Sequence, residues 1–134
     1  MKRTLSLVLL LALLLCGCGG KGDVSDVQMN IGPSKLYGEG EIRAAMGVVV
    51  EFFGKNFDNC ALYELSYDEE FSAKHAEAEA AQYGADDAIV LKSVFEVGAE
   101  GSNGSLEPGS THYYTWTLTR SGDGMWNLRN WGYA

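Results

Sequence analysis

The sequence predicts an α+β domain, in which a long amphipathic helix packs on a curved antiparallel sheet of about four strands and a second helix is short. Three observations carry this expectation. Apolar residues recur at helical spacing over residues 39–56, an Ala- and Glu-rich stretch follows at 69–83, and the C-terminal third holds three closely spaced β-type segments. Closely spaced strands favour antiparallel pairing, and a helix laid on such a sheet gives a two-layer domain.

The first helix is expected over residues 39–56. Gly38 is its expected N-cap, and Glu39 and Glu41 carry negative charge near the positive start of the helix. The apolar positions are three or four residues apart, so they form one wide stripe that faces a sheet. The stripe consists of Ile42, Ala45, Met46, Val49, Val50, Phe53 and Phe57, and Val48 and Phe52 widen it.

A strand is expected over residues 60–67, where polar and apolar residues alternate, and a second helix over 69–83. Gly84 follows this helix and is the residue type that most often ends a helix in a left-handed conformation. The apolar face of the second helix is weak, so we expect it to be packed shallowly and partly exposed.

The remainder is β-type, with strands expected over 88–97, 113–120 and 126–131. The Ser-Gly-Asp-Gly run at 121–124 indicates a tight hairpin between the last two strands. Residues 98–110 form a long connection rich in Gly and Ser. Connections of this length are either mobile or functional, and both readings stay open for this one.

The first 17 residues have the pattern of an export signal. Lys2 and Arg3 precede an apolar run at residues 5–15 that is interrupted only by Ser6. Eleven helical residues span about 16 Å, roughly half of a bilayer core. This length is typical of the apolar region of a signal peptide and is too short for a membrane-spanning helix.

The signal ends in Leu15-Cys16-Gly17-Cys18, which resembles a bacterial lipobox. The resemblance implies cleavage after Gly17 and lipidation of Cys18, so that the chain is anchored on the outer face of the cell membrane. Two acyl chains give stable anchoring, whereas one chain binds only marginally. The alternative is an ordinary secretory signal with two incidental cysteines.

Removal of residues 1–17 reduces the basic residues from 10 to 8 and leaves all 18 acidic residues, a net charge of −10. Such a charge disfavours binding to nucleic acid, whose phosphates it repels. Residues 18–33 are rich in Gly, Ser and Asp, and we expect them to be a flexible tether from Cys18. Residues 34–134 then form a single domain.

Several single residues have both a functional and a structural interpretation. Cys60, the one cysteine beside Cys18 in the mature chain, is either a reactive thiol or a small buried residue, and the absence of a nearby base favours burial. His75 and His112 lack zinc-ligand spacing and are expected to be exposed. The acidic run 68–70 suits a helix start better than a metal site.

Five aromatic residues near the C-terminus are the candidate ligand cleft: Tyr114, Trp116, Trp126, Trp131 and Tyr133. Strict alternation places Tyr114 and Trp116 on one face of their strand. It places Trp126 and Leu128 on one face of the next strand, and Trp131 and Tyr133 on the other. The rings either line a cleft for an apolar ligand or peptide, or form the core beneath the first helix.

Five segments resemble a family of small uncharacterised lipoproteins and exported domains of Gram-positive bacteria. The segments are 39–46, 59–62, 82–91, 104–111 and 130–133, and the resemblance covers about residues 35–133. It implies a cystatin-like or NTF2-like fold, and it implies no established activity. Asn130 departs from the acidic residue expected before the Trp-Gly-Tyr ending, which weighs against a catalytic carboxylate at that position.

No hydrolase, metalloprotease, P-loop or dinucleotide-binding signature is present. We therefore expect no cofactor, no metal and no catalytic residue. The leading hypothesis is a membrane-anchored binding or interaction module whose partner is a protein, a peptide or a small apolar ligand. The alternatives are a small NTF2-like enzyme that uses a conical pocket, and a structural accessory domain.

Overall fold

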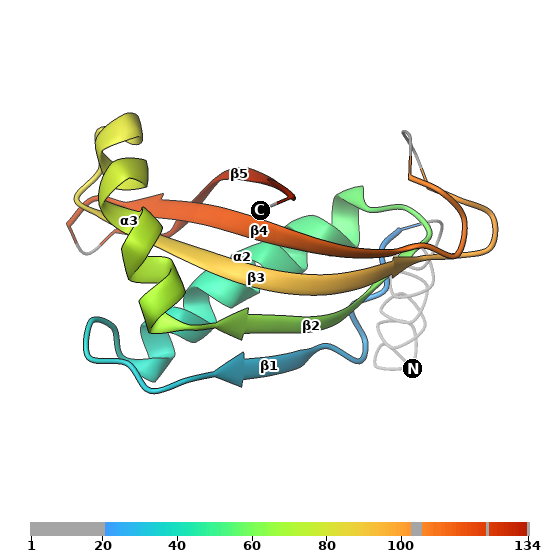
Figure 1. The fold of residues 1–134 in the computed structure, drawn as a ribbon, viewed down its shortest axis with the longest axis horizontal. Helices are drawn as coiled ribbons and strands as arrows, with labels where there is room; N and C mark the ends of the chain where they lie inside the picture. Colours follow the sequence, from blue (N-terminus) through green and yellow to red (C-terminus); the bar gives the residue numbers. More distant parts are fainter. Residues whose placement is uncertain (1–20, 103–105, 123, 134) are drawn as a thin grey trace, which may run out of the picture.

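The computed structural model describes residues 21–102, 106–122 and 124–133, so the expected signal peptide and Cys18 lie outside the described residues. Two helices and five strands follow one another along this part of the chain (Figure 1). They are β1 (Gln28–Ile31), α2 (Glu39–Asn56), β2 (Cys60–Tyr67), α3 (Glu69–Tyr83), β3 (Asp87–Val97), β4 (Thr111–Arg120) and β5 (Asn127–Tyr133).

The α+β class is confirmed, but the sheet is mixed and has five strands rather than about four antiparallel ones. The strands lie in the order β1-β2-β3-β4-β5. The pairs from β2 to β5 are antiparallel, whereas β1 runs parallel to β2. The bounds expected for α2, β2 and α3 agree with the structure, and β3, β4 and β5 differ from their expected bounds by one or two residues.

The additional strand lies within residues 18–33, which were expected to be a flexible tether, and it corrects that expectation for residues 28–31. Residues 28–31 pair in register with residues 64–67 of β2, and Asp23 makes a further bridge to Ala61. The side chains of Met29 and Ile31 are half-buried and alternate with exposed Gln28 and Asn30. This short period-2 alternation was the sequence signal for β1. The polar residues on both sides of the alternation concealed the strand.

The core lies between α2 and one face of the sheet, as the stripe on the helix predicted. Figure 1 shows α2 crossing behind the sheet, with α3 on its other side at one end. Trp116 of β4 is fully buried, and its indole N–H donates to the hydroxyl of Ser93 on β3 at 2.7 Å. The largest fully buried side chains are Trp116, Phe53, Phe95, Ile42, Met46, Leu62, Leu65, Ile89, Leu91 and Leu118.

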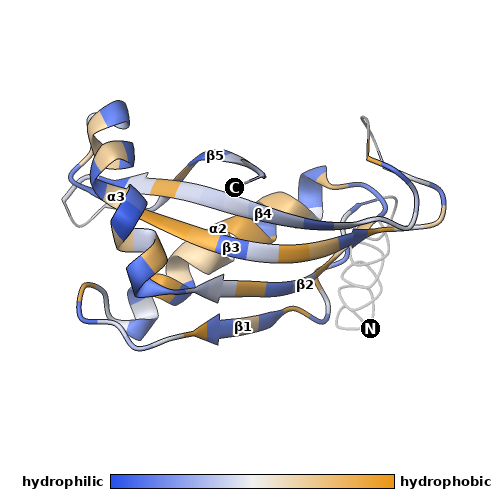
Figure 2. Cartoon of the chain, viewed as in Figure 1, coloured by the Kyte–Doolittle hydropathy of each residue, from blue (hydrophilic) through white to orange (hydrophobic). Residues whose placement is uncertain are grey.

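β3 is the central strand, and its burial changes along its length. Residues 88–91 are all buried because α2 covers one face and α3 covers the other. Beyond Leu91 the burial alternates, since the face opposite α2 is no longer covered. Figure 2 shows this as a continuous hydrophobic stretch on β3 that gives way to a mixed one. The Ala-Ile-Val-Leu run of the sequence is therefore the doubly covered part of the strand.

β3 also extends beyond the end of β2, whose pairing stops at Lys92. Two side chains replace the missing strand there. The Ser72 hydroxyl of α3 accepts from the Val90 N–H at 3.0 Å, and the Tyr37 hydroxyl donates to the Ala88 carbonyl at 3.2 Å. The Val90 N–H and the Ala88 carbonyl thus have hydrogen-bond partners although no described strand pairs with them on this side.

Candidate binding cleft

A cleft of about 430 Å³ opens beside the C-terminal end of α2. Its volume lies within the range typical of small-molecule sites. Residues of α2, of the 98–110 connection, of β4 and of β5 contribute to it. The lining residues are Phe52, Asn56, Phe57, Asp58, Ser102, Leu106, Tyr114, Trp131 and Gly132.

One wall of the cleft is held by the turn between α2 and β2. Asn59 in this turn has a left-handed backbone with φ of 58°, which asparagine tolerates better than most residues. Its side-chain amide donates to the Gly101 carbonyl at 2.7 Å, and its own carbonyl accepts from the Gly98 N–H at 2.7 Å. Two bonds therefore fix the start of the 98–110 connection against the end of the helix.

The five predicted aromatic residues divide between core and cleft. Trp116 and Trp126 are buried, as the core interpretation predicted. Tyr114 is half-buried and lines the cleft, and Trp131 lines it with 40 % of its surface exposed. Tyr133 is 66 % exposed and packs edge-on against Tyr114. The set is therefore neither a pure core nor a single cleft.

Trp131 forms an outer layer over the core. Its ring stacks on buried Trp116 with the ring centres 6.1 Å apart, and it lies 4.5 Å from the ring of Phe52 on α2. One side of the indole thus rests on the core while the remainder of the ring is open to solvent. An indole held in this way presents a rigid apolar surface to a ligand.

A register shift explains why strict alternation placed these rings wrongly. Leu118 pairs with Leu128, but Thr117 pairs with Asn130, so Arg129 is an extra residue in β5. The bulge reverses the alternation, so Leu128, Trp131 and Tyr133 lie on the same face of the sheet as their partners Leu118, Trp116 and Tyr114. On this face Trp131 contacts Phe52 of α2. The Arg129 side chain points to the other face, where it donates to the Thr119 hydroxyl at 2.9 Å.

Sequence reasoning missed the helix side of the cleft. The apolar stripe assigns Phe52 and Phe57 to the packing face of α2, and no motif gives Asn56, Asp58 or Leu106 a role. The only sequence signal for this side of the cleft is the width of the apolar stripe on α2. A wide stripe is equally typical of a helix that is fully packed on a sheet, so the signal is weak.

Three polar side chains beside the cleft, those of Ser110, His112 and Tyr133, are joined by hydrogen bonds. The two ring nitrogens of His112 lie 2.7 Å from the Ser110 hydroxyl and 2.6 Å from the Tyr133 hydroxyl. Ser110 donates its own hydrogen to the Glu107 carbonyl, so it accepts from the imidazole. In this arrangement the hydroxyl hydrogen of Ser110 is directed to Glu107 and not to the imidazole, where activation by a general base would require it. His112 is also stacked on Phe95 and half-buried, contrary to the expectation that it is exposed.

The other candidate residues from the sequence lie in surroundings that give them no functional partner within the described residues. His75 is exposed on α3 and contacts Phe71. Cys60 is buried, and desolvation raises the pKa of its thiol, which opposes formation of a reactive thiolate. Asn130 is exposed on β5.

The acidic run 68–70 stabilises a turn. The Glu69 carboxylate accepts from the backbone N–H groups of Lys35 and Leu36, each at 3.0 Å, and from the Ser34 hydroxyl at 2.7 Å. These bonds, led by the one from Lys35, lower the pKa of Glu69 to about 2. The carboxylate therefore joins the start of α3 to the segment that leads into α2.

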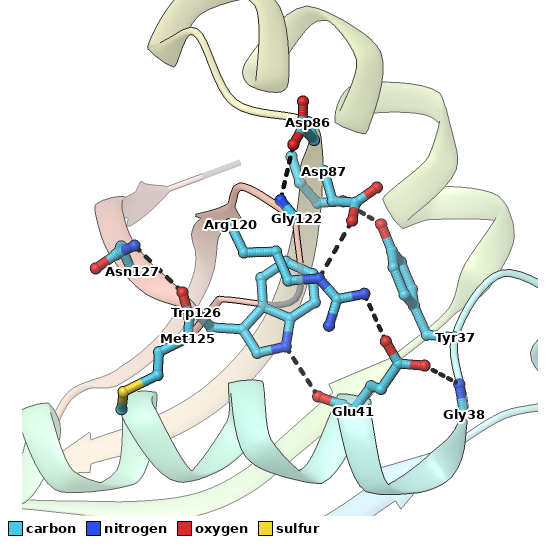
Figure 3. Close-up of polar contacts among 11 residues, drawn as sticks. Tyr37, Gly38, Glu41, Asp86, Asp87, Arg120, Gly122, Met125, Trp126 and Asn127 are labelled. Atoms are coloured by element: carbon cyan, nitrogen blue, oxygen red, sulfur yellow. Dashed lines mark hydrogen bonds and ion pairs between the residues drawn. The ribbon is translucent and has the colours of Figure 1, made fainter.

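A second polar cluster lies at the opposite end of α2 (Figure 3). Arg120, at the end of β4, forms ion pairs with Glu41 of α2 and with Asp87 of β3. Its guanidinium carbon lies 4.4 Å from the ring centre of Trp126 and 5.4 Å from that of Tyr37. The Trp126 N–H donates to the Glu41 carbonyl at 3.1 Å. All of these groups are engaged with one another, so the cluster is a structural junction.

Within the described part of the chain, no three His, Cys, Asp or Glu side chains are placed to hold a metal ion. Neither of the described helices has the length and apolar character needed to span a bilayer.

Comparison with known proteins gives no match to a family model, to a curated protein or to a solved structure. A function for this chain is therefore inferred from the geometry of its own residues.

Proposed function

We propose that this chain is an exported lipoprotein, anchored through a lipid on Cys18, whose domain binds an apolar or aromatic group in the cleft at the C-terminal end of α2. The observation that carries the binding role is Trp131, an indole that rests on the core yet keeps 40 % of its surface exposed in a cleft of about 430 Å³. Large exposed apolar surfaces in a concave site are typical of binding sites.

The lining favours a ligand of mixed character. Phe52, Leu106 and Trp131 supply apolar contacts, and Asn56 supplies a polar side chain that is exposed to solvent. A small apolar ligand or the side chain of a peptide fits this combination. We include in the proposal a cystatin-like or NTF2-like arrangement, which is supported by a long helix that crosses antiparallel strands β2 to β5.

The cleft is tested with 8-anilinonaphthalene-1-sulfonate, a fluorescent probe of apolar sites, on the soluble domain of residues 19–134. We expect saturable binding that Trp131→Ala weakens at least about tenfold, which is the loss expected from removing 1.4 kcal/mol of contact. Tyr113→Ala is the matched control, because Tyr113 is an aromatic residue of β4 that is 67 % exposed and faces away from α2. Equal binding by both variants contradicts the proposed site.

The anchor is tested separately in the producing cell. We expect Cys18→Ser to leave an uncleaved precursor or to release the domain into the medium, since serine cannot form the thioether to the lipid. The same change at Cys16 is the control and is expected to leave anchoring intact. Normal processing and membrane retention of Cys18→Ser contradicts the lipoprotein proposal.

A further inference from the structure

The start of the described chain is fixed to the fold almost immediately. The Gly22 N–H donates to the Gly54 carbonyl at 3.1 Å, and the Asp23 N–H donates to the Cys60 carbonyl at 2.8 Å. The Asp23 carbonyl in turn accepts from the Leu62 N–H at 2.9 Å. Three backbone hydrogen bonds thus hold residues 22 and 23 between the end of α2 and the start of β2.

Gly22 packs so closely that only glycine fits there. A Cβ atom at this position would lie 2.4 Å from the Phe53 carbonyl oxygen and 3.1 Å from that of Phe57. Figure 1 shows the blue start of the described chain beside the C-terminal end of α2. The chain therefore enters the domain at this end.

The length of chain between Cys18 and this fixed point limits the reach of the domain. A tether that ended at Pro33 would span up to about 54 Å when fully extended. Only four residue steps separate Cys18 from Gly22, and they span at most about 14 Å. The contacts of Gly22 and Asp23 therefore reduce the reach of a lipid anchor to about a quarter of the expected value.

We infer that the anchored domain is held against the headgroup layer of the bilayer, with the C-terminal end of α2 toward the membrane. This inference rests on the proposed lipid at Cys18. The surface at this end suits the headgroup layer and not the hydrocarbon core, because Lys21, Lys55, Asn56 and Asn59 are exposed there. The partner of this surface is the bilayer itself.

The position of the cleft gives this orientation a functional meaning. Asn56, Phe57 and Asp58 line the cleft. In the chain they lie between Gly54 and Cys60, whose carbonyls accept from the N–H groups of Gly22 and Asp23. The cleft therefore lies at the membrane-facing end of the domain, within reach of groups on the membrane surface.

The test uses the intact lipoprotein in phosphatidylcholine vesicles that contain a headgroup-attached fluorescence quencher. Single labelling sites are placed by Lys55→Cys and Glu39→Cys, at the two ends of α2, about 24 Å apart along the helix. The sites are matched, because each residue is exposed and each loses one surface ion pair within the helix, Lys55 with Glu51 and Glu39 with Arg43. Cys60→Ala in both proteins removes the remaining thiol.

We expect the label at residue 55 to be quenched several-fold more strongly than the label at residue 39. Insertion of a flexible linker of about 20 Gly and Ser residues between Gly20 and Lys21, which spans about 25 Å, should abolish the difference. Equal quenching at both sites in the lipidated protein without the linker overturns the inference and leaves the anchor in place. A mature N-terminus without lipid, seen by mass spectrometry, overturns the anchor and the inference together.

Discussion

Aromatic residues pack at both ends of α2, but the space beside them is filled at one end and open at the other. At the N-terminal end, Tyr37 and Trp126 enclose the guanidinium of Arg120, and carboxylates on both sides pair with it. At the C-terminal end, Phe52 and Trp131 also lie against each other, but an open cleft remains beside them. The Arg120 side chain fills the space between the rings at the N-terminal end, which we call the closed end. The C-terminal end, which we call the open end, keeps a cleft beside its rings. Changes at the two ends should therefore affect different properties.

The largest effect is expected beneath the open end. Trp116→Ala removes a fully buried indole and leaves the Ser93 hydroxyl without its donor. We expect a loss of about 4 kcal/mol in the free energy of unfolding, the usual cost of truncating a buried aromatic residue. Urea unfolding followed by circular dichroism measures it. A loss as small as that of a surface substitution would show that Trp116 belongs to the ligand surface and not to the core.

Arg120→Met is expected to show that the closed end is structural. It leaves Glu41 and Asp87 without their cation, and the Arg120 side chain is only 16 % exposed. We expect a loss of about 2 kcal/mol in the free energy of unfolding. Binding of 8-anilinonaphthalene-1-sulfonate by the folded variant should be unchanged, because the cleft lies at the other end of the helix. Loss of binding without loss of stability would reverse the assignment of the two ends.

The closed end should also carry an acid-sensitive contribution to stability through Glu69, which holds residues 34–36 before the start of α2. The pKa of this carboxyl falls from 4.5 to about 2 on folding. A lowered pKa stabilises the fold above pH 4.5, and this contribution is lost as the pH falls from 4.5 toward 2.

Acid unfolding of Glu69→Gln should therefore depend less on pH within that window than unfolding of the natural protein. Glu70→Gln, in the same turn of α3, is the control for the change in net charge. Identical pH dependence of the natural protein and Glu69→Gln would show that the bonds to residues 34–36 do not distinguish the charged from the neutral carboxyl.

The smallest effect on stability is expected for Trp131→Ala at the open end. Its ring is 40 % exposed, and we expect the free energy of unfolding to fall by no more than about 1 kcal/mol. Weakened probe binding with nearly unchanged stability would sharpen the contrast with Arg120→Met. A loss comparable to that of Trp116→Ala would place Trp131 in the core, and the cleft would lose its main binding surface.

Local patterns predicted the helices well because each is encoded within a few residues. The stripe on α2 and Gly84, which has a left-handed φ of 63°, set the bounds of their elements. β1 was missed because four residues gain a strand's stability only from pairing with β2 more than 30 residues away.

The cleft was predicted only in part for a related reason. Its walls come from α2, a long connection and two strands, and the sequence shows only which rings are present. The bulge at Arg129 decided which face the rings occupy, and one extra residue in a strand leaves no distinctive composition.

The close contact of Gly22 with α2 also has a consequence for the order of events during export. Under the proposed anchor, the enzymes that lipidate Cys18 and cleave after Gly17 act on a site four residues before a glycine enclosed by the carbonyls of Phe53 and Phe57. A packed domain leaves little free backbone for their active sites. Modification of the N-terminus should therefore precede the docking of Gly22, and completion of the fold becomes the last step of maturation.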